Sequence, residues 1–140
     1  MYRKIFIDSS AWINATLIGE PHHDEAKRLL SDFVKGGLSI FTSNDVVDET
    51  VTRLLYRVSF KVAEDFYTIF RQSVVRGSIV QLWVDDQLQD EAWNLVKKFR
   101  EHRLSLTDAT SIALLRRFNL DAIVTFDDDF KKVGVVTIPP

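Results

Sequence analysis

Four stretches of the sequence each carry a carboxylate at the end of an apolar run. They are IFID, which ends at Asp8, NDVVDE at Glu49, LSLTD at Asp108 and IVTFD at Asp127. In open parallel α/β sheets, ligands bind in the crevice outside the carboxyl ends of the strands. Carboxylates that meet there repel one another unless a cation neutralises them, and their oxygens suit Mg²⁺ or Mn²⁺. The four acids therefore predict a site for a divalent metal ion.

Each acid also has a purely structural interpretation. Asp8 suits a turn or a helix N-cap after a strand. Glu49 suits the first turns of a helix, where acids favour the macrodipole, and it can pair with Arg53 four residues later. Asp108 suits a helix start behind Thr107, the expected N-cap. No single acid is specific, so the prediction of a metal site depends on their combination.

The fourth acid opens a run of three, Asp127, Asp128 and Asp129. Successive side chains on an extended segment diverge, so the three cannot all bind one ion. Asp127 lies nearest the strand and is the favoured ligand, with Asp129 as the reserve. Asp128 is expected to point into solvent.

The composition is that of an ordinary globular chain. With 140 residues it is close to the commonest domain size, so one domain over residues 1–140 is expected. Hydrophobic residues make up 46% of the chain, enough for a core, and the absence of cysteine excludes disulfides and thiolate metal sites. No apolar run reaches a membrane-spanning length, and an acid at position 8 argues against a signal peptide. A soluble cytoplasmic protein is expected.

Alternating hydrophobic patterns predict strands and helices in turn. Apolar or β-branched runs predict strands at residues 4–7, 38–43, 79–84, 121–126 and 134–138. Apolar residues at helical spacing predict helices around residues 26–34, 47–58, 61–76, 88–99 and 108–118. The apolar stripes of these helices include Val34, Val58, Ile69 and Phe118. Strands that alternate with helices imply right-handed crossovers, so the predicted fold class is α/β, with a mostly parallel sheet and helices on both faces.

Taken together, the acidic stretches resemble those of PIN-domain ribonucleases, in particular the VapC-like toxins of toxin–antitoxin pairs. IFIDSSAWI resembles the family's opening strand with its acid, Asp8, and TSNDVVDETVTRL resembles the segment with the helical acid, Glu49. LSLTDATSIAL resembles the best-marked family segment, at Asp108, and IVTFDDDF resembles the closing signature, at Asp127. The match runs nearly end to end and keeps the family's order. Ser9 stands where the family often has Thr, which keeps the hydroxyl.

The resemblance implies a PIN-like fold with a five-stranded sheet and an acidic pocket that binds one or two Mg²⁺ or Mn²⁺ ions. It implies a metal-dependent endoribonuclease that hydrolyses RNA phosphodiester bonds. The implied catalytic and metal-binding residues are Asp8, Glu49, Asp108 and Asp127, with Asp129 in reserve. The implied accessory hydroxyls are those of Ser9, Thr107 and Thr125.

Protein partners are also implied by the resemblance. Toxins of this type pair with a small antitoxin that covers the acidic pocket, and they commonly form homodimers. Five aromatic residues can supply an apolar interface, although core packing is the expected use of most of them. These are Phe60, Phe66, Phe70, Trp83 and Trp93.

An RNA substrate must be held by local cations, because a net charge of −2 gives no general attraction to nucleic acid. Basic residues follow Glu49 and flank Asp108. The candidates are Arg53, Arg57, Lys97, Lys98, Arg100, Arg103, Arg116 and Arg117. A solvated helix face is the alternative use of each of them.

Other proteins with acids at strand ends fit this sequence less well. A receiver-like phosphoacceptor needs an acid pair after the first strand, where this chain has one acid. A haloacid-dehalogenase-type phosphatase needs a second Asp two residues after the nucleophile, where this chain has Ser10. The histidines, His22, His23 and His102, lie outside the acidic motifs and are not expected to act. A PIN-like domain that binds RNA or protein without cutting it remains the open alternative.

Overall fold

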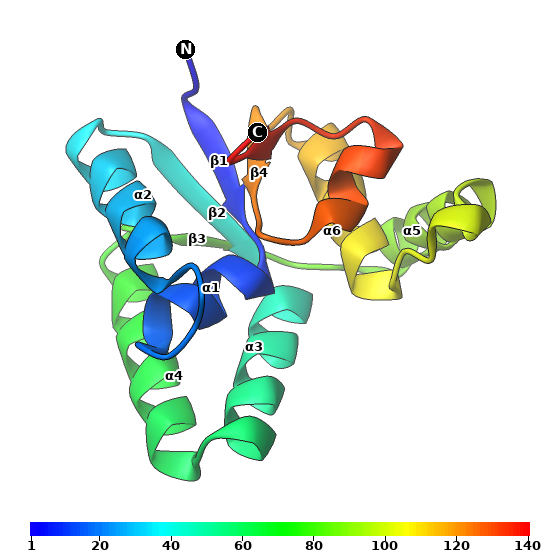
Figure 1. The fold of residues 1–140 in the computed structure, drawn as a ribbon. Helices are drawn as coiled ribbons and strands as arrows, with labels where there is room; N and C mark the ends of the chain where they lie inside the picture. The colour runs from blue at the N-terminus through cyan, green and yellow to red at the C-terminus, as the bar shows by residue number, and fades with distance from the viewer.

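A five-stranded sheet with helices on both faces forms the protein, and the computed structural model describes all of residues 1–140 (Figure 1). The strands are β1 (Lys4–Ile7), β2 (Ser39–Ser43), β3 (Val80–Leu82), β4 (Ala122–Val124) and β5 (Thr137–Ile138). Their order across the sheet is β3-β2-β1-β4-β5, and every neighbouring pair is parallel. The predicted α/β class is confirmed, and the sheet is parallel throughout.

Helices make the crossovers between the strands. They are α1 (Ser9–Thr16), α2 (His23–Lys35), α3 (Asn44–Arg57), α4 (Phe60–Val75), α5 (Asp86–Lys98), α6 (Leu106–Arg117) and the 3₁₀ helices η1 (Arg100–His102) and η2 (Asp128–Val133). Right-handed crossovers put α1 to α4 on one face of the sheet. After β3 the chain returns past β1 to form β4 and then β5 on the other side of it, so α5, α6 and η2 lie on the other face of the sheet (Figure 1). No helix combines the length and the apolar character needed to cross a bilayer.

The reversal of strand order lies between β1 and β4, at the centre of the sheet. The chain leaves β1 at Asp8, and it leaves β4 at Thr125. The two exits are joined by a hydrogen bond from the Asp8 N–H to the Val124 carbonyl (3.0 Å). Ligands of parallel sheets bind at such a switch point, outside the carboxyl ends of the strands. Two of the four predicted acids therefore follow strands that meet at the expected crevice.

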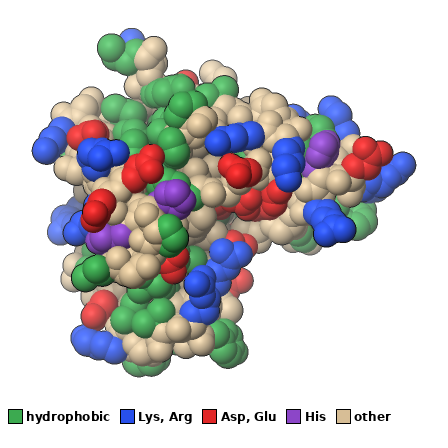
Figure 2. All heavy atoms as spheres, viewed as in Figure 1, with side chains coloured by type: hydrophobic (Ala, Val, Ile, Leu, Met, Phe, Trp, Pro, Cys, Tyr) green, Lys and Arg blue, Asp and Glu red, His purple; other side chains and the backbone are tan.

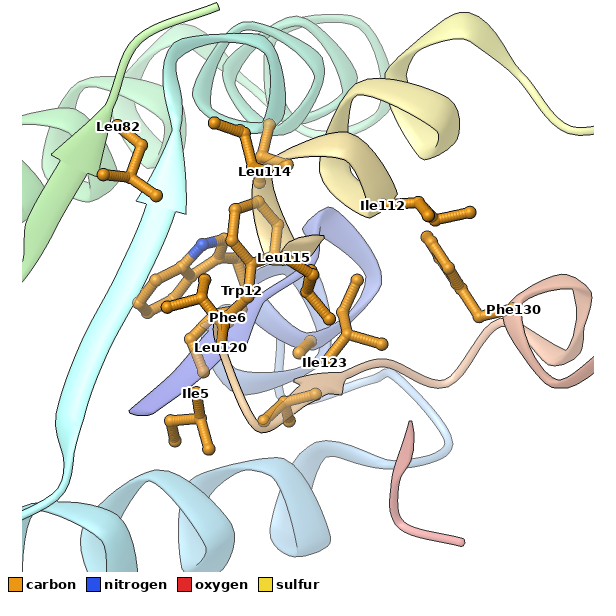
Figure 3. Close-up of a cluster of buried hydrophobic side chains, with 14 of the residues drawn as sticks. Ile5, Phe6, Trp12, Leu82, Ile112, Leu114, Leu115, Leu120, Ile123 and Phe130 are labelled. Atoms are coloured by element: carbon orange, nitrogen blue, oxygen red, sulfur yellow. The ribbon is translucent and has the colours of Figure 1, made fainter. Parts of the chain in front are cut away.

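The central strand is held between two layers of apolar side chains. Ile5, Phe6 and Ile7 are fully buried, as expected for a parallel strand covered on both faces. In the close-up of the core, Ile112 of α6 and Phe130 of η2 point toward one another beside β4 (Figure 3). Packing of η2 against α6 fixes the chain just after the Asp127–Asp129 run, so the core also positions that run.

The helix that carries Asp108 begins earlier than predicted. Ser105, and not Thr107, is the N-cap of α6. The Asp108 N–H donates to the Ser105 hydroxyl (3.0 Å), and the Ser105 N–H donates to the Asp108 carboxylate (3.2 Å). This capping box satisfies two backbone donors at once, whereas a Thr107 cap would satisfy one. The prediction of Thr107 as N-cap was wrong for this reason.

Some predicted core positions lie at the surface. Val58 and Phe118 are the C-caps of α3 and α6, where the helices end, and both are exposed. Val34 is exposed near the end of α2. Ile69 is exposed because α1, α2 and α4 leave between them an apolar cavity of about 470 Å³, which it lines.

The last strand is shorter than predicted. A strand was expected over residues 134–138, and β5 covers only Thr137–Ile138. The 3₁₀ helix η2 ends at Val133, and Gly134, its C-cap, has a positive φ of 77°. A backbone in the left-handed region cannot continue a strand, so pairing with β4 starts only after it.

We expect Ile112→Ala to lower the free energy of unfolding by about 2–5 kcal/mol, because it leaves a cavity between α6 and η2. Ile69→Ala is the matched control, and we expect it to change the free energy of unfolding by no more than about 0.5 kcal/mol. Urea denaturation followed by circular dichroism measures both values. Equal losses in the two variants would contradict this assignment of the core.

Candidate functional site

A polar pocket of about 240 Å³ opens at the carboxyl edge of the sheet. None of its lining residues is hydrophobic. They are Asp8, Ser9, Ser10, Glu49, Arg53, Arg103, Ser105, Asp108, Asp127 and Asp129. On the molecular surface, acidic side chains gather in a hollow with basic side chains to either side (Figure 2). The structure thus brings all four predicted acids and the reserve acid into one pocket.

Asp8 enters the pocket directly from β1 and is almost fully buried. Its Oδ2 accepts hydrogen bonds from the hydroxyls of Thr125 (2.9 Å) and Ser10 (3.1 Å). Its side chain makes no capping hydrogen bond to α1, although the residue occupies the N-cap position. The interpretation of Asp8 as a side-chain helix cap is therefore wrong.

Hydroxyl groups tie the start of α1 to the segment after β4. The Phe126 N–H donates to the Ser10 hydroxyl (2.9 Å), and the Asp127 N–H donates to the Thr125 hydroxyl (3.0 Å). The two hydroxyl oxygens are themselves 3.1 Å apart. The same groups that hold Asp8 thus also fix the backbone that leads to Asp127.

Glu49 reaches the pocket from the second turn of α3. Ser43 caps this helix by accepting the Val46 N–H (3.1 Å), which sets the helix start directly after β2. Oε1 of Glu49 accepts the Ser9 hydroxyl and lies 3.2 Å from the guanidinium of Arg53. The predicted pairing with Arg53 and the predicted place in the pocket are therefore both present.

The third and fourth acids, Asp108 and Asp127, lie close together in the pocket. One carboxylate oxygen from each of Asp108, Asp127 and Asp129 lies within 4.8 Å of the others. Asp127 Oδ1 accepts the Asp129 N–H (2.9 Å), and Asp129 lies 3.2 Å from Lys132. Asp128 is exposed and lies 3.5 Å from Lys131, as expected of a solvated acid. Both Asp127 and the reserve Asp129 are thus within reach of an ion beside Asp108.

Proximity and burial raise the pKa values of three of these acids. Burial raises the pKa of Asp108 to about 7, and the charges of Asp8 and Asp127 contribute to the rise. Burial also raises the pKa of Asp8, with a further contribution from Glu49, although its hydrogen bond with Thr125 acts in the opposite direction. The pKa of Asp127 is raised by burial and by the charge of Asp129. When all three carboxyl groups are ionised, the positive charge around them is too small to offset their mutual repulsion.

This donor set fits a hard divalent cation. Its oxygens come from carboxylates and hydroxyls, with no thiol or imidazole among the pocket residues. Mg²⁺ and Mn²⁺ prefer such oxygen ligands, and their charge would favour the ionised forms of Asp8, Asp108 and Asp127. Raised pKa values are expected of carboxylates that are arranged to share a cation, because only the cation would offset their repulsion.

Only two of the eight candidate RNA-binding residues, Arg53 and Arg103, line the pocket. Arg57 pairs with Glu20 (3.4 Å), and Arg117 lies 3.0 Å from Glu91. Thr107 lies outside the pocket lining. So do the four other candidates, which are Lys97, Lys98, Arg100 and Arg116.

Sequence reasoning missed two pocket residues, Ser10 and Ser105. Ser105 stands three residues before Asp108, the spacing of a capping box, so this signal was present in the sequence. Ser10 carried no such signal, because its partner Thr125 is 115 residues away. The tertiary contact alone identifies it.

A histidine also lies closer to the pocket than its sequence position indicated. The His22 ring stacks on Phe126, with ring centroids 4.5 Å apart and planes 7° apart. The His22 N–H donates to Asn14 (3.0 Å), and Asn14 donates to the Ser10 carbonyl (2.8 Å). The loop between α1 and α2 is thereby held beside the segment that leads to Asp127.

Comparison with known proteins identifies the family of this chain. The family model for the PIN domain matches residues 5–136. The chain belongs to the PIN-domain family. VapC20 of Mycobacterium tuberculosis, a 23S rRNA-specific endonuclease, is 32% identical over 136 residues, which are 97% of this chain and 98% of VapC20. The predicted family and fold are thus confirmed.

Structural comparison of this PIN-domain protein gives the same result. The crystal structure of M. tuberculosis VapC20, described as a sarcin-ricin loop cleaving toxin, matches with a TM-score of 0.84 at 31% identity, over 94% of this chain and 96% of that chain. Ribonuclease VapC6 of Methanocaldococcus jannaschii is 24% identical over 150 residues, which are 96% of this chain and 95% of VapC6. VapBC2 of Rickettsia felis matches with a TM-score of 0.67 at 15% identity, over 95% of this chain and 96% of that chain, and shows the fold alone.

We expect Asp108→Asn to stabilise the metal-free protein, and more so at high pH. Between about pH 4 and 7 the folded wild type keeps a proton that the unfolded chain loses, so its free energy of unfolding falls as pH rises. The Asn side chain does not ionise, so the variant lacks this pH-dependent loss of stability. Its amide oxygen can still accept a hydrogen bond from the Ser105 N–H. In EDTA, the melting temperature of the variant should exceed that of wild type by several degrees at pH 8 and by less at pH 5.

Asp128→Asn is the control for this pH dependence, because Asp128 is the exposed member of the acidic run. Its melting temperature should follow that of wild type at both pH values. A gap between Asp108→Asn and wild type that stays constant from pH 5 to pH 8 would contradict the raised pKa of Asp108.

Proposed function

We propose that this protein is a metal-dependent endoribonuclease and the toxin of a toxin–antitoxin pair. The observation that carries the proposal is the convergence of five carboxylates in one pocket at the switch point of a PIN-domain sheet. Support comes from VapC20, an endonuclease that this chain matches over nearly its whole length. The alternative of a domain that binds without cutting is not favoured, because every predicted acid is present and lines the pocket.

Asp8, Asp108 and the Asp127–Asp129 pair would hold Mg²⁺ or Mn²⁺, with Glu49 in direct contact or in contact through water. A bound ion of this kind supplies an acidified water for attack on phosphorus and offsets charge on the phosphate. Ser10 and Thr125 donate hydrogen bonds to Oδ2 of Asp8 and so hold its carboxylate at the pocket. Ser9 and Arg53 hold Glu49 at the pocket wall.

The proposed substrate is RNA, because the matched relative of known specificity acts on 23S rRNA. A phosphodiester that enters the pocket meets carboxylates on its inner wall and the arginines Arg53 and Arg103 among its lining. Cations at such positions hold the backbone of a nucleic acid without reading its sequence. Ribosomal RNA is therefore the first substrate to test.

We also propose an antitoxin partner and a homodimer. Phe60, Trp83 and Trp93 are exposed, whereas Phe66 and Phe70 are buried in the core. Exposed aromatic residues and an open apolar cavity are typical of surfaces that other proteins cover. The cavity between α1, α2 and α4 offers such a surface.

We expect Asp8→Asn and Asp108→Asn each to lower the rate of RNA cleavage by at least about 100-fold, since loss of a metal contact worth about 3 kcal/mol has this effect. Purified bacterial 23S rRNA, incubated with Mg²⁺ or Mn²⁺ and read by sequencing of the new ends, measures cleavage. EDTA should abolish the activity of the wild type.

Calorimetric titration with Mn²⁺ separates loss of the ion from loss of the fold. Both variants should bind Mn²⁺ more weakly than the wild type while they keep its circular dichroism spectrum. Asp128→Asn is the matched control, and it should cleave and bind Mn²⁺ as the wild type does. Cleavage by Asp108→Asn at the wild-type rate, or wild-type cleavage in EDTA, would sink the proposal.

A further inference from the structure

Arg103 has an unfavourable backbone conformation at the edge of the acidic pocket. Its φ of 55° and ψ of 40° lie in the left-handed region, at the end of η1. Besides glycines, only Arg103 and Asn119 have positive φ in this chain. Asn tolerates the left-handed region comparatively well, and glycine adopts it freely, but arginine has no such advantage. The backbone alone would favour glycine at position 103, so a use for the side chain would explain the arginine.

The chain around Arg103 fixes its place relative to the acids. The next residue, Leu104, is buried in the core, and Ser105 forms the capping box with Asp108. Arg103 is thus held between a core anchor and the helix start that carries Asp108. It lines the same pocket as Asp8, on the side of the η1–α6 connection.

Arg103 also differs in charge balance from the other arginine of the pocket. Arg53 lies 3.2 Å from Glu49, so its charge is already paired. Arg103 forms no ion pair within 4.0 Å of any carboxylate. A guanidinium without a protein partner, beside a pocket that must accept an anion, is available to that anion.

We propose that Arg103 binds a phosphate group of the RNA strand in the acidic pocket and positions that strand for cleavage. The inference rests on the proposed nuclease function and specifies how the substrate is held. The carboxylates of the pocket repel an RNA backbone, so a cation is needed at its edge. Arginine suits this task because its planar guanidinium donates two parallel hydrogen bonds to a phosphate.

Arg103→Gly tests the proposal because it relieves the unfavourable backbone conformation, which favours stability, and removes the proposed phosphate contact, which lowers cleavage. Relief of the left-handed backbone should leave the melting temperature unchanged or raise it by up to about 4 °C. Cleavage of purified 23S rRNA at subsaturating concentration should fall about 10- to 100-fold, as expected for the loss of a charged hydrogen bond. Affinity for Mn²⁺, measured by calorimetry, should stay at the wild-type value.

Asn119→Gly is the matched control, because Asn119 has a φ of 53° and is exposed outside the pocket. It should change the melting temperature in the same direction and leave cleavage unchanged. Arg103→Lys keeps the charge but not the paired hydrogen bonds, so its cleavage should lie between those of the wild type and Arg103→Gly.

Binding of the same RNA gives a readout that does not require cleavage. In the Asp108→Asn background, Arg103→Gly should weaken binding and reduce the slope of log affinity against log salt by about 1, the value for one lost phosphate contact. Arg103→Lys should keep the slope. Asn119→Gly should change neither affinity nor slope.

The outcomes separate this inference from the proposed function. If the wild type cleaves and Arg103→Gly cleaves equally well, the inference is wrong and the nuclease function stands. If the wild type does not cleave, the nuclease function fails, and Arg103 is still judged by RNA binding and its salt slope. A fall in melting temperature or Mn²⁺ affinity in Arg103→Gly would assign a structural role instead.

Discussion

Repulsion among buried carboxylates is the constraint on which the carboxyl edge of this sheet depends. Asp8 and Asp108 lie in a pocket with Glu49, Asp127 and Asp129, and Arg53 is the one basic residue of the pocket paired with any of these acids. Burial and mutual repulsion make ionisation costly, which is why the pKa of Asp108 rises to about 7. A cluster of this kind persists only because the surrounding fold holds it. Its unfavourable energy without a cation is also what would make it bind one tightly.

Neutral donors and the apolar core provide that support. Hydroxyls from Ser10 and Thr125 fix Asp8, a capping box fixes Asp108, and the backbone of η2 fixes Asp127. Behind them, β1 is covered on both faces, and Phe130 is fully buried beyond the acidic run. The acids are therefore held in place before an ion arrives. A prearranged set of ligands loses little conformational freedom on binding, which favours both affinity and the correct geometry.

Arg103 is a second energetically unfavourable feature that the rest of the fold holds in place. A left-handed backbone at a residue with a Cβ costs about 1–2 kcal/mol, and Arg103 adopts it next to the acidic pocket. Two kinds of unfavourable energy, electrostatic at the acids and conformational at Arg103, thus occur at one site. The rest of the molecule offsets both through its buried core. Functional sites are where proteins commonly accept such losses in stability.

The sequence by itself determined the α/β class, the strand-end position of Asp8 and Asp127 and the helical position of Glu49 and Asp108. Those features depend on local patterns: apolar runs, helical spacing and caps a few residues apart. Only the tertiary structure decided that Ser10 contacts Thr125, that Arg53 and Arg103 but not Arg57 or Arg117 line the pocket, and that Ile69 is exposed. Contacts between residues far apart in the chain depend on strand order and helix packing, and no local pattern encodes them. The sequence placed Asp8 and Asp127 after strands and Glu49 and Asp108 in the first turns of helices, and strand order and helix packing then brought the four acids together.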